Sequence, residues 1–216
     1  MKKIMFNEAY GLTQATIKGR KTNTRRAEFD EAEQTRLNLY AEQGYRSFVE
    51  DNRVLVRDSE GTLLFSKPTR YKVGEVVAVA QSYERIYEEL WEIDKYEASH
   101  YAAISEKPGW RNKMFVKAEL MPYRIRITGM RAERLQEISD ADCLREGIFF
   151  HEYTTNHEKR SHYGFDGFLN GGEVWFVRGW YDTPREAFSV LIDKVSGHGT
   201  WASNPWVVAY EYELVK

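Results

Sequence analysis

The residues most able to do chemistry lie close together in the run "GRKTNTRR", residues 19–26. With Lys18 included, five basic side chains fall within nine positions, and no acidic residue separates them. Threonine and asparagine add neutral hydrogen-bonding groups to the same run. A segment this polar is not expected in a core. The sequence therefore predicts a solvated cationic edge, a phosphate-binding loop or part of a reactive site.

A second candidate is Glu146, in the segment "ISDADCLREGI", residues 138–148. Ser139 and Asp142 have the spacing of a helix N-terminal cap, and Gly147 is a typical helix stop, so a short helix is predicted. Glu146 then lies at the C-terminal end, where a carboxylate opposes the helix dipole. Local helix stability does not explain this residue, which leaves chance or a role in a site.

The hydrophobic pattern indicates the elements that must position these residues. Helices are expected over 7–19, 28–43, 87–105, 138–148 and 183–199. The last of these has Thr183 as N-cap, Pro184 at the first position and Glu186 completing the capping box. Strands are expected over 3–6, 53–58, 62–67, 113–121, 123–135 and 205–215, with another led by Gly74. Short strands with helices between them favour a small mixed barrel over a doubly wound sheet.

The segment 123–128 alternates apolar and polar residues, which is typical of a strand with one solvated face. Arg124 and Arg126 lie on the polar face, where they could contact phosphate. A solvated sheet face is the more ordinary outcome of this pattern.

Length and composition bound the class of protein. The chain has 216 residues, of which 42% are hydrophobic and 30% charged, and this favours one folded domain over residues 1–216. A net charge of -2 excludes a protein that coats nucleic acid by bulk electrostatics, so RNA binding would need a local patch. No apolar stretch suits a signal peptide or a membrane span, which predicts a soluble cytoplasmic protein that does not engage a membrane. Cys143 is the single cysteine and is expected to be a buried structural thiol.

Two regions are expected to be insertions. Residues 28–70 combine an acidic helical stretch with two strands joined by the turn signal "SEGT". Residues 148–182 are rich in aromatic residues and glycine, and we expect a loop or lid near the site.

Four blocks of the chain resemble the ASCH domain family in the order in which that family has them. They are "IKGRKTNTRR", "VGEVVAV", "LQEISDADCLREGI" and "WASNPWVVAYEYEL". The "NPWV" block is similar to ASCH proteins of phages and prophage-like regions. The resemblance implies an α+β fold, a PUA-like mixed β-barrel with flanking helices and the two insertions.

The resemblance also implies a function. ASCH domains are expected to bind RNA, and a small bacterial member that is similar to this chain is an amidohydrolase that deacetylates acetylcytidine. In that branch a lysine, a threonine and a glutamate carry the reaction, and the matching positions here are Lys21, Thr24 and Glu146. A threonine hydroxyl needs a base, which a desolvated lysine can supply, and Glu146 would orient the pair. Because Lys21 and Thr24 would face opposite ways in a regular strand, we expect irregular backbone between them.

The first hypothesis is that the chain binds RNA or a modified nucleoside through a pocket built on this basic run, and amide hydrolysis is the alternative. Basic side chains would position phosphates, and Trp110, Trp175 or Trp206 could stack bases, although a tryptophan is more often a core residue. The expected binding residues are Arg20, Lys21, Thr22, Asn23, Arg25, Arg26, Arg124, Arg126 and Trp206.

Two further alternatives stay open. A ribonuclease would need a general base that the basic run does not provide by itself. An inactive phage interaction module is favoured by Ala80 and Gln81, which stand where many phage-type members have an Arg-Glu pair.

Metal binding is not expected. His151, His157 and His162 lie near Glu152 and Glu158, but the histidine spacings of six and five match no common ligand pattern. No cofactor is predicted.

Overall fold

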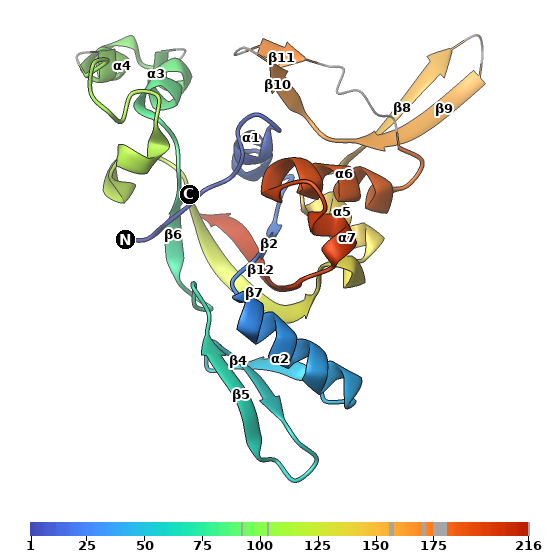
Figure 1. Ribbon diagram of the computed structural model, residues 1–216. Helices are drawn as coiled ribbons and strands as arrows, with labels where there is room; N and C mark the ends of the chain where they lie inside the picture. Colours follow the sequence, from blue (N-terminus) through green and yellow to red (C-terminus); the bar gives the residue numbers. More distant parts are fainter. Residues whose placement is uncertain (92, 103, 156–157, 170–171, 175–180, 216) are drawn as a thin grey trace.

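The computed structural model describes residues 1–91, 93–102, 104–155, 158–169, 172–174 and 181–215. Its centre is a five-stranded sheet with the order β1-β6-β7-β12-β2. The strands are β1 Lys3–Ile4, β6 Val76–Val79, β7 Arg124–Arg134, β12 Trp206–Val215 and β2 Asn23–Arg26. β1 runs parallel to β6, and the other neighbours are antiparallel. The two longest strands, β7 and β12, form the middle of the molecule (Figure 1).

The α+β class is confirmed, but the main sheet is not a closed barrel within the described residues. β1 and β2 are its two edges, and no backbone ladder joins them. A side chain spans part of this gap, because Arg26 Nη2 donates to the carbonyl of Met5 at 2.7 Å. β1 has only two residues, so it offers little backbone for a closing ladder.

The predicted alternation along β7 is confirmed. Ile125 and Ile127 are fully buried, whereas Arg126 is exposed and pairs with Glu213 of β12 at 2.9 Å. The apolar side of β7 therefore faces the main core, and the polar side faces solvent.

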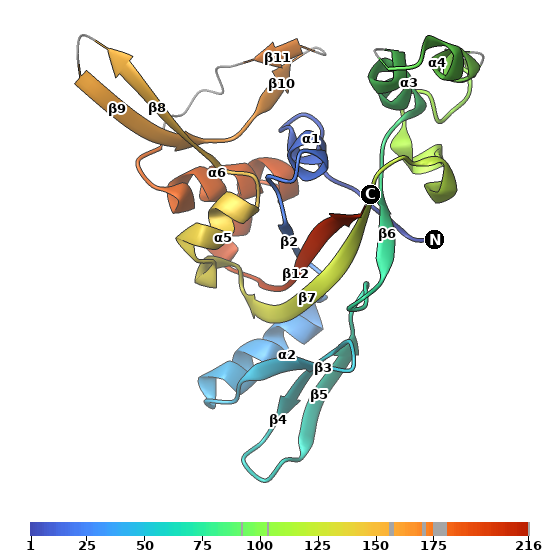
Figure 2. The same cartoon turned by 180° about the vertical axis from the view of Figure 1, so that it is seen from behind.

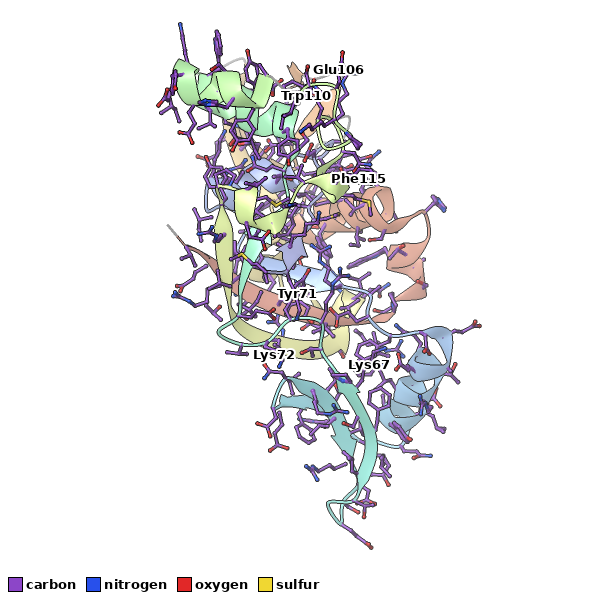
Figure 3. The ribbon with its side chains drawn as sticks, turned by 90° about the vertical axis from the view of Figure 1, so that its left-hand side faces the viewer. Lys67, Tyr71, Lys72, Glu106, Trp110 and Phe115 are labelled. Atoms are coloured by element: carbon purple, nitrogen blue, oxygen red, sulfur yellow. The ribbon has the colours of Figure 1, made fainter. Side chains whose placement is uncertain are left out.

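Residues 28–70 contain the predicted helix and hairpin. The helix α2 Glu31–Glu42 begins with a capping box between Asp30 and Glu33. The strands β4 Arg53–Arg57 and β5 Leu63–Pro68 pair as expected, and β3 Ser47–Glu50 adds a third strand that was not predicted. This unit lies at one end of the molecule (Figures 1 and 2), and Figure 3 labels Lys67, Tyr71 and Lys72 along its connection to β6.

Between residues 83 and 121, the described secondary structure consists of α-helices and 3-10 turns. The predicted helix is two helices, α3 Tyr83–Trp91 and α4 Lys95–Ala102. The strand predicted over 113–121 is wrong, because this segment forms the 3-10 turns η1 Lys113–Phe115 and η2 Ala118–Leu120. Lys3 Nζ donates to the carbonyls of residues 113, 114 and 116, which holds the turns against the start of the chain. Phe115 projects on the outside (Figure 3).

Residues 148–182 were expected to be a loop, but their described part is mostly strand. β8 Phe149–Thr155 and β9 Glu158–Gly164 form a hairpin, and β10 Gly167–Leu169 pairs with β11 Gly172–Val174. The hairpin extends from the α5-α6 side of the molecule (Figure 1). Trp175 and His157 lie outside the described residues.

The remaining helices flank the main sheet. α1 Leu12–Ile17 starts after Gly11 and so is shorter than predicted. The others are η3 Leu135–Glu137, α5 Asp140–Arg145, α6 Pro184–Ser196 and α7 Thr200–Ser203. As predicted, Ser139 accepts from the backbone N–H of Asp142, and Thr183 from that of Glu186. In the part of the chain described above, every helix is too short or too polar to cross a membrane.

Candidate functional site

Half of the residues in the basic run are buried, and this corrects the expectation that the run could not enter a core. Lys21 is 2% exposed, and Asn23, Thr24 and Arg25 are also buried. After α1, Gly19 has φ +72, and the backbone N–H groups of Arg20 and Lys21 both donate to the carbonyl of Ala15. This turn directs the Lys21 side chain inward. Charged groups can be buried here because other charged groups surround them.

The amine of Lys21 has three acceptors. Its Nζ lies 2.5 Å from Oε2 of Glu146 and 2.9 Å from each of the carbonyls of Glu146 and Asn23. The ring of Phe6 lies 5.6 Å from the same nitrogen. Burial lowers the pKa of Lys21 below its usual value of 10.5, and the attraction of Glu146 offsets this shift only in part.

Glu146 occupies the position after α5, where helix stability gave no reason for a carboxylate. Its side chain accepts from Lys21 through Oε2 and from Arg25 Nη1 through Oε1 at 3.0 Å. Gly147 follows with φ +108, and a Cβ there would lie 3.2 Å from Leu12 and 3.8 Å from Lys21. A glycine therefore allows α1 and the Lys21 side chain to approach the end of α5.

Arg25 connects three carboxylates. Its Nε donates to Glu133 at 2.7 Å, its Nη1 to Glu146 at 3.0 Å and its Nη2 to Asp142 at 3.1 Å. Its side chain is 1% exposed. Although burial raises the pKa of Asp142, the Arg131 and Arg25 guanidiniums hold it below its usual value.

The cluster continues outward to the surface. Arg131 bonds to Glu133, Asp142 and Glu211, and Arg145 bonds to Asp142 and Glu211. The cations are Lys21, Arg25, Arg131 and Arg145, and the anions are Glu133, Asp142, Glu146 and Glu211. The two charges balance, so the cluster as a whole offers no excess positive charge to a phosphate.

Thr24 lies in β2 and is buried. It is paired with Tyr210, whereas Asn23 is paired with Glu211, so Thr24 and Asn23 face opposite sides of the sheet. No hydrogen bond of the Thr24 hydroxyl is found within the described chain. The backbone at Lys21 and Thr22 precedes the strand, as expected, and Nζ of Lys21 bonds to the carbonyl that directly precedes Thr24.

Three of the other arginines expected to bind a ligand have partners within the protein. Arg20 pairs with Asp166 at 2.7 Å, and Arg126 with Glu213. Arg26 donates to Met5 and lies over the ring of Phe6. Arg124 is half-buried at the edge of β7 where it meets β6.

Two polar or aromatic candidates also have partners within the chain. Thr22 accepts from Arg145 at 3.2 Å. The indole of Trp206 is 7% exposed, donates to Asn38 and is covered by Arg134, so it offers no open face to a base.

Sequence reasoning missed Glu133, Asp142 and Tyr212 as parts of the site. Glu133 lies on β7 and is buried against Arg25, and Asp142 was read only as a capping residue. Tyr212 lies 3.1 Å from the hydroxyl of Thr16, and burial raises the pKa of its phenol. Glu133 lies in a strand that the sequence predicts. No pattern in a single sequence indicates which arginine this glutamate contacts.

A cavity of about 280 Å³ lies beside α1, between its start and α3. Its lining includes Gly11, Gln14, Ser82 and Arg85 but not Lys21, Thr24 or Glu146. In the described ranges, no three His, Cys, Asp or Glu side chains are placed to hold a metal ion.

Comparison with known proteins adds no assignment. No protein-family model matches the chain, and no curated protein or solved structure matches it.

Proposed function

We propose that this chain is an ASCH-type domain with a PUA-like fold, and that it hydrolyses the acyl amide of a modified, cytidine-like nucleoside. The observation that carries the proposal is the buried contact of 2.5 Å between Lys21 and Glu146, with Lys21 also bonded to the carbonyl of Asn23, the residue before Thr24. Because burial lowers the pKa of Lys21, a larger fraction of this amine is deprotonated at a given pH than for an exposed lysine, which favours a role as a base. The resemblance of the four sequence blocks to the ASCH family supports the same assignment.

The reaction can be written with these residues alone. The neutral amine of Lys21 takes the proton of the Thr24 hydroxyl, and the oxygen attacks the carbonyl carbon of the acyl group. Lys21 then gives this proton to the departing amine as the C–N bond breaks. Lys21 then takes a proton from water, the water oxygen attacks the threonyl ester carbonyl, and the C–O bond breaks to release the acyl group as a carboxylic acid while the proton returns to the Thr24 oxygen. Glu146 holds the lysine amine in place through both half-reactions.

Binding of RNA through the basic run is the less favoured function. A phosphate-binding surface needs cations that are accessible and not neutralised. Lys21 and Arg25 are buried and paired with carboxylates, and Arg20 pairs with Asp166. The charge balance of the cluster therefore supports a reactive pair over an open basic groove.

A substrate needs a path to the site, because Lys21, Thr24 and Glu146 are each at most 5% exposed. Phe6 and Leu12 lie against the Lys21 side chain and its neighbour Gly147. We propose that these apolar side chains move aside when the substrate enters.

The test is hydrolysis of acetylcytidine by the purified protein, with chromatography of the nucleoside products. The Lys21→Ala, Glu146→Gln and Thr24→Val variants are measured beside it, and Glu213→Gln serves as a control in an exposed ion pair. Release of cytidine by the wild type and the control, and its loss in the three variants, is the expected result. No turnover by any of the proteins would overturn this substrate, and salt-dependent titration with single-stranded RNA would then test the binding alternative.

A further inference from the structure

Arg25 was expected to contact a ligand, but its surroundings exclude that role. Its side chain is 1% exposed, and each end of its guanidinium group donates to a carboxylate of the protein. A guanidinium presents five N–H donors in a fixed plane, so several partners at once fix its position. Arg25 must therefore act through the groups that it contacts.

The most informative of these groups is Glu146, because Arg25 and Lys21 bind opposite oxygens of its carboxylate. Arg25 Nη1 lies 3.0 Å from Oε1, and Lys21 Nζ lies 2.5 Å from Oε2. Two donors on different oxygens fix both the position and the plane of a carboxylate. Among the described residues, removal of Arg25 would leave Lys21 as the remaining partner of the Glu146 carboxylate.

Arg25 is itself held from the side away from Lys21. Glu133 and Asp142 bind its Nε and Nη2, and Arg131 bonds to both of these carboxylates. This arrangement links the solvent-accessible part of the cluster to the buried Glu146. The guanidinium is therefore a rigid support and not a mobile side chain.

We infer that Arg25 is a positioning residue, which holds the Glu146 carboxylate against Lys21 and opposes protonation of Lys21 by its own charge. Its effect on the rate rests on the proposed function. Its effect on the ionisation of Lys21 does not, because that effect follows from charge and geometry alone.

The sign of this effect follows from the groups that face Lys21. They are Glu146 at the end of α5, and Arg26 and Arg25 from β2. Substituting glutamine for Arg25 removes a positive charge and leaves Glu133, Asp142 and Glu146 with less compensation. Both changes favour protonated lysine, so the pKa of Lys21 is expected to rise.

The first measurement is the Lys21 pKa by NMR of protein labelled at lysine side chains, with the signal assigned by its loss in Lys21→Ala. Arg25→Gln is expected to raise this pKa, whereas Arg25→Lys keeps the charge and is expected to leave it near the wild-type value. Arg131→Gln is the matched control, because Arg131 belongs to the same cluster but does not contact Glu146.

The second measurement is the pH dependence of acetylcytidine hydrolysis. In Arg25→Gln, the pH at which the rate falls on the acid side is expected to rise together with the Lys21 pKa. In Arg25→Lys, the rate is expected to fall while this pH stays unchanged. A purely structural role would lower the rate or the stability in both variants and leave this pH unchanged.

The two proposals fail in different ways. A raised Lys21 pKa in Arg25→Gln without hydrolysis by any variant would overturn the proposed reaction and support the role of Arg25. An unchanged Lys21 pKa in folded Arg25→Gln, or an equal rise in Arg131→Gln, would overturn the role of Arg25. If Arg25→Gln does not fold, the double variant with Glu133→Gln removes one buried carboxylate together with the guanidinium. A smaller rise is expected there, and no rise would again contradict the inference.

Discussion

Lys21 and Glu146 are separated by 125 positions in the sequence, yet the amine of one lies 2.5 Å from the carboxylate of the other in the interior of the protein. The turn after α1 delivers the lysine, and the end of α5 delivers the glutamate. The side chains are 2% and 6% exposed. The stability of the protein and the ionisation of Lys21 should both depend on this contact.

Substituting glutamine for Glu146 removes the charge that compensates a buried ammonium. Breaking a buried pair in this way leaves an unpaired charge, so we expect the free energy of unfolding to fall by about 3 kcal/mol at neutral pH. Urea denaturation measures the change. Glu213→Gln, in the exposed pair with Arg126, should cost less than about 1 kcal/mol. Equal losses in the two variants would show that the Lys21 pair is no more important than a surface pair.

The pH dependence of stability should carry a signature of Lys21. Its pKa is lower in the folded protein than the usual 10.5, so between these two values the unfolded chain binds more protons. Stability contributed by this group therefore rises as the pH rises through that window. As the pH rises toward 10.5, the wild type should gain unfolding free energy relative to Lys21→Met. A constant difference between the two proteins over this range would contradict the lowered pKa.

Thr24 offers a test that separates chemistry from folding. No hydrogen bond of its hydroxyl is found in the described part of the protein, so Thr24→Val should leave the thermal unfolding temperature almost unchanged. If Thr24 is the nucleophile, the valine variant should lose acetylcytidine hydrolysis by at least about a thousandfold. Thr24→Ser keeps the hydroxyl and should retain measurable activity. Full activity in the valine variant would assign the nucleophile elsewhere.

Gly147→Ala should disturb the approach of α1 to α5. Gly147 has φ +108, and an added Cβ would lie 3.2 Å from Leu12. We expect a loss of about 2–4 kcal/mol in unfolding free energy, from backbone conformation and overpacking together. Gly44→Ala is the control, since Gly44 has φ +84 but no atom within 4 Å of an added Cβ. A similar loss in both variants would show that only the backbone angle matters.

Trp206 should behave as a core residue and not as a base-stacking platform. Its ring is 7% exposed and is fixed by Asn38 and Arg134, while its backbone bonds to Gln34 of α2. Trp206→Ala is expected to lower the unfolding free energy by about 3–5 kcal/mol. Trp91→Ala, at a 40% exposed position, should cost much less. A loss of RNA affinity in folded Trp206→Ala, with stability unchanged, would restore the stacking role.

The elements with strong local signals were predictable from the sequence. The caps at Ser139 and Thr183 start helices where expected, and the alternation around Ile125 and Arg126 gives the two faces of β7. These signals work because capping and periodicity depend on residues only a few positions apart. The segment 113–121 misled the same reasoning, since its turns depend on Lys3, a residue more than a hundred positions away.

The sequence by itself determined that "GRKTNTRR" was the segment to explain, and it placed Glu146 at a helix end without a local reason for being there. Only the tertiary structure decided that Lys21 and Arg25 are buried and that carboxylates from β7 and α5 neutralise them. Local sequence records which residues carry charge. Whether a charge is solvated or buried depends on partners that distant segments bring within about 3 Å, where pairing can offset the cost of desolvation.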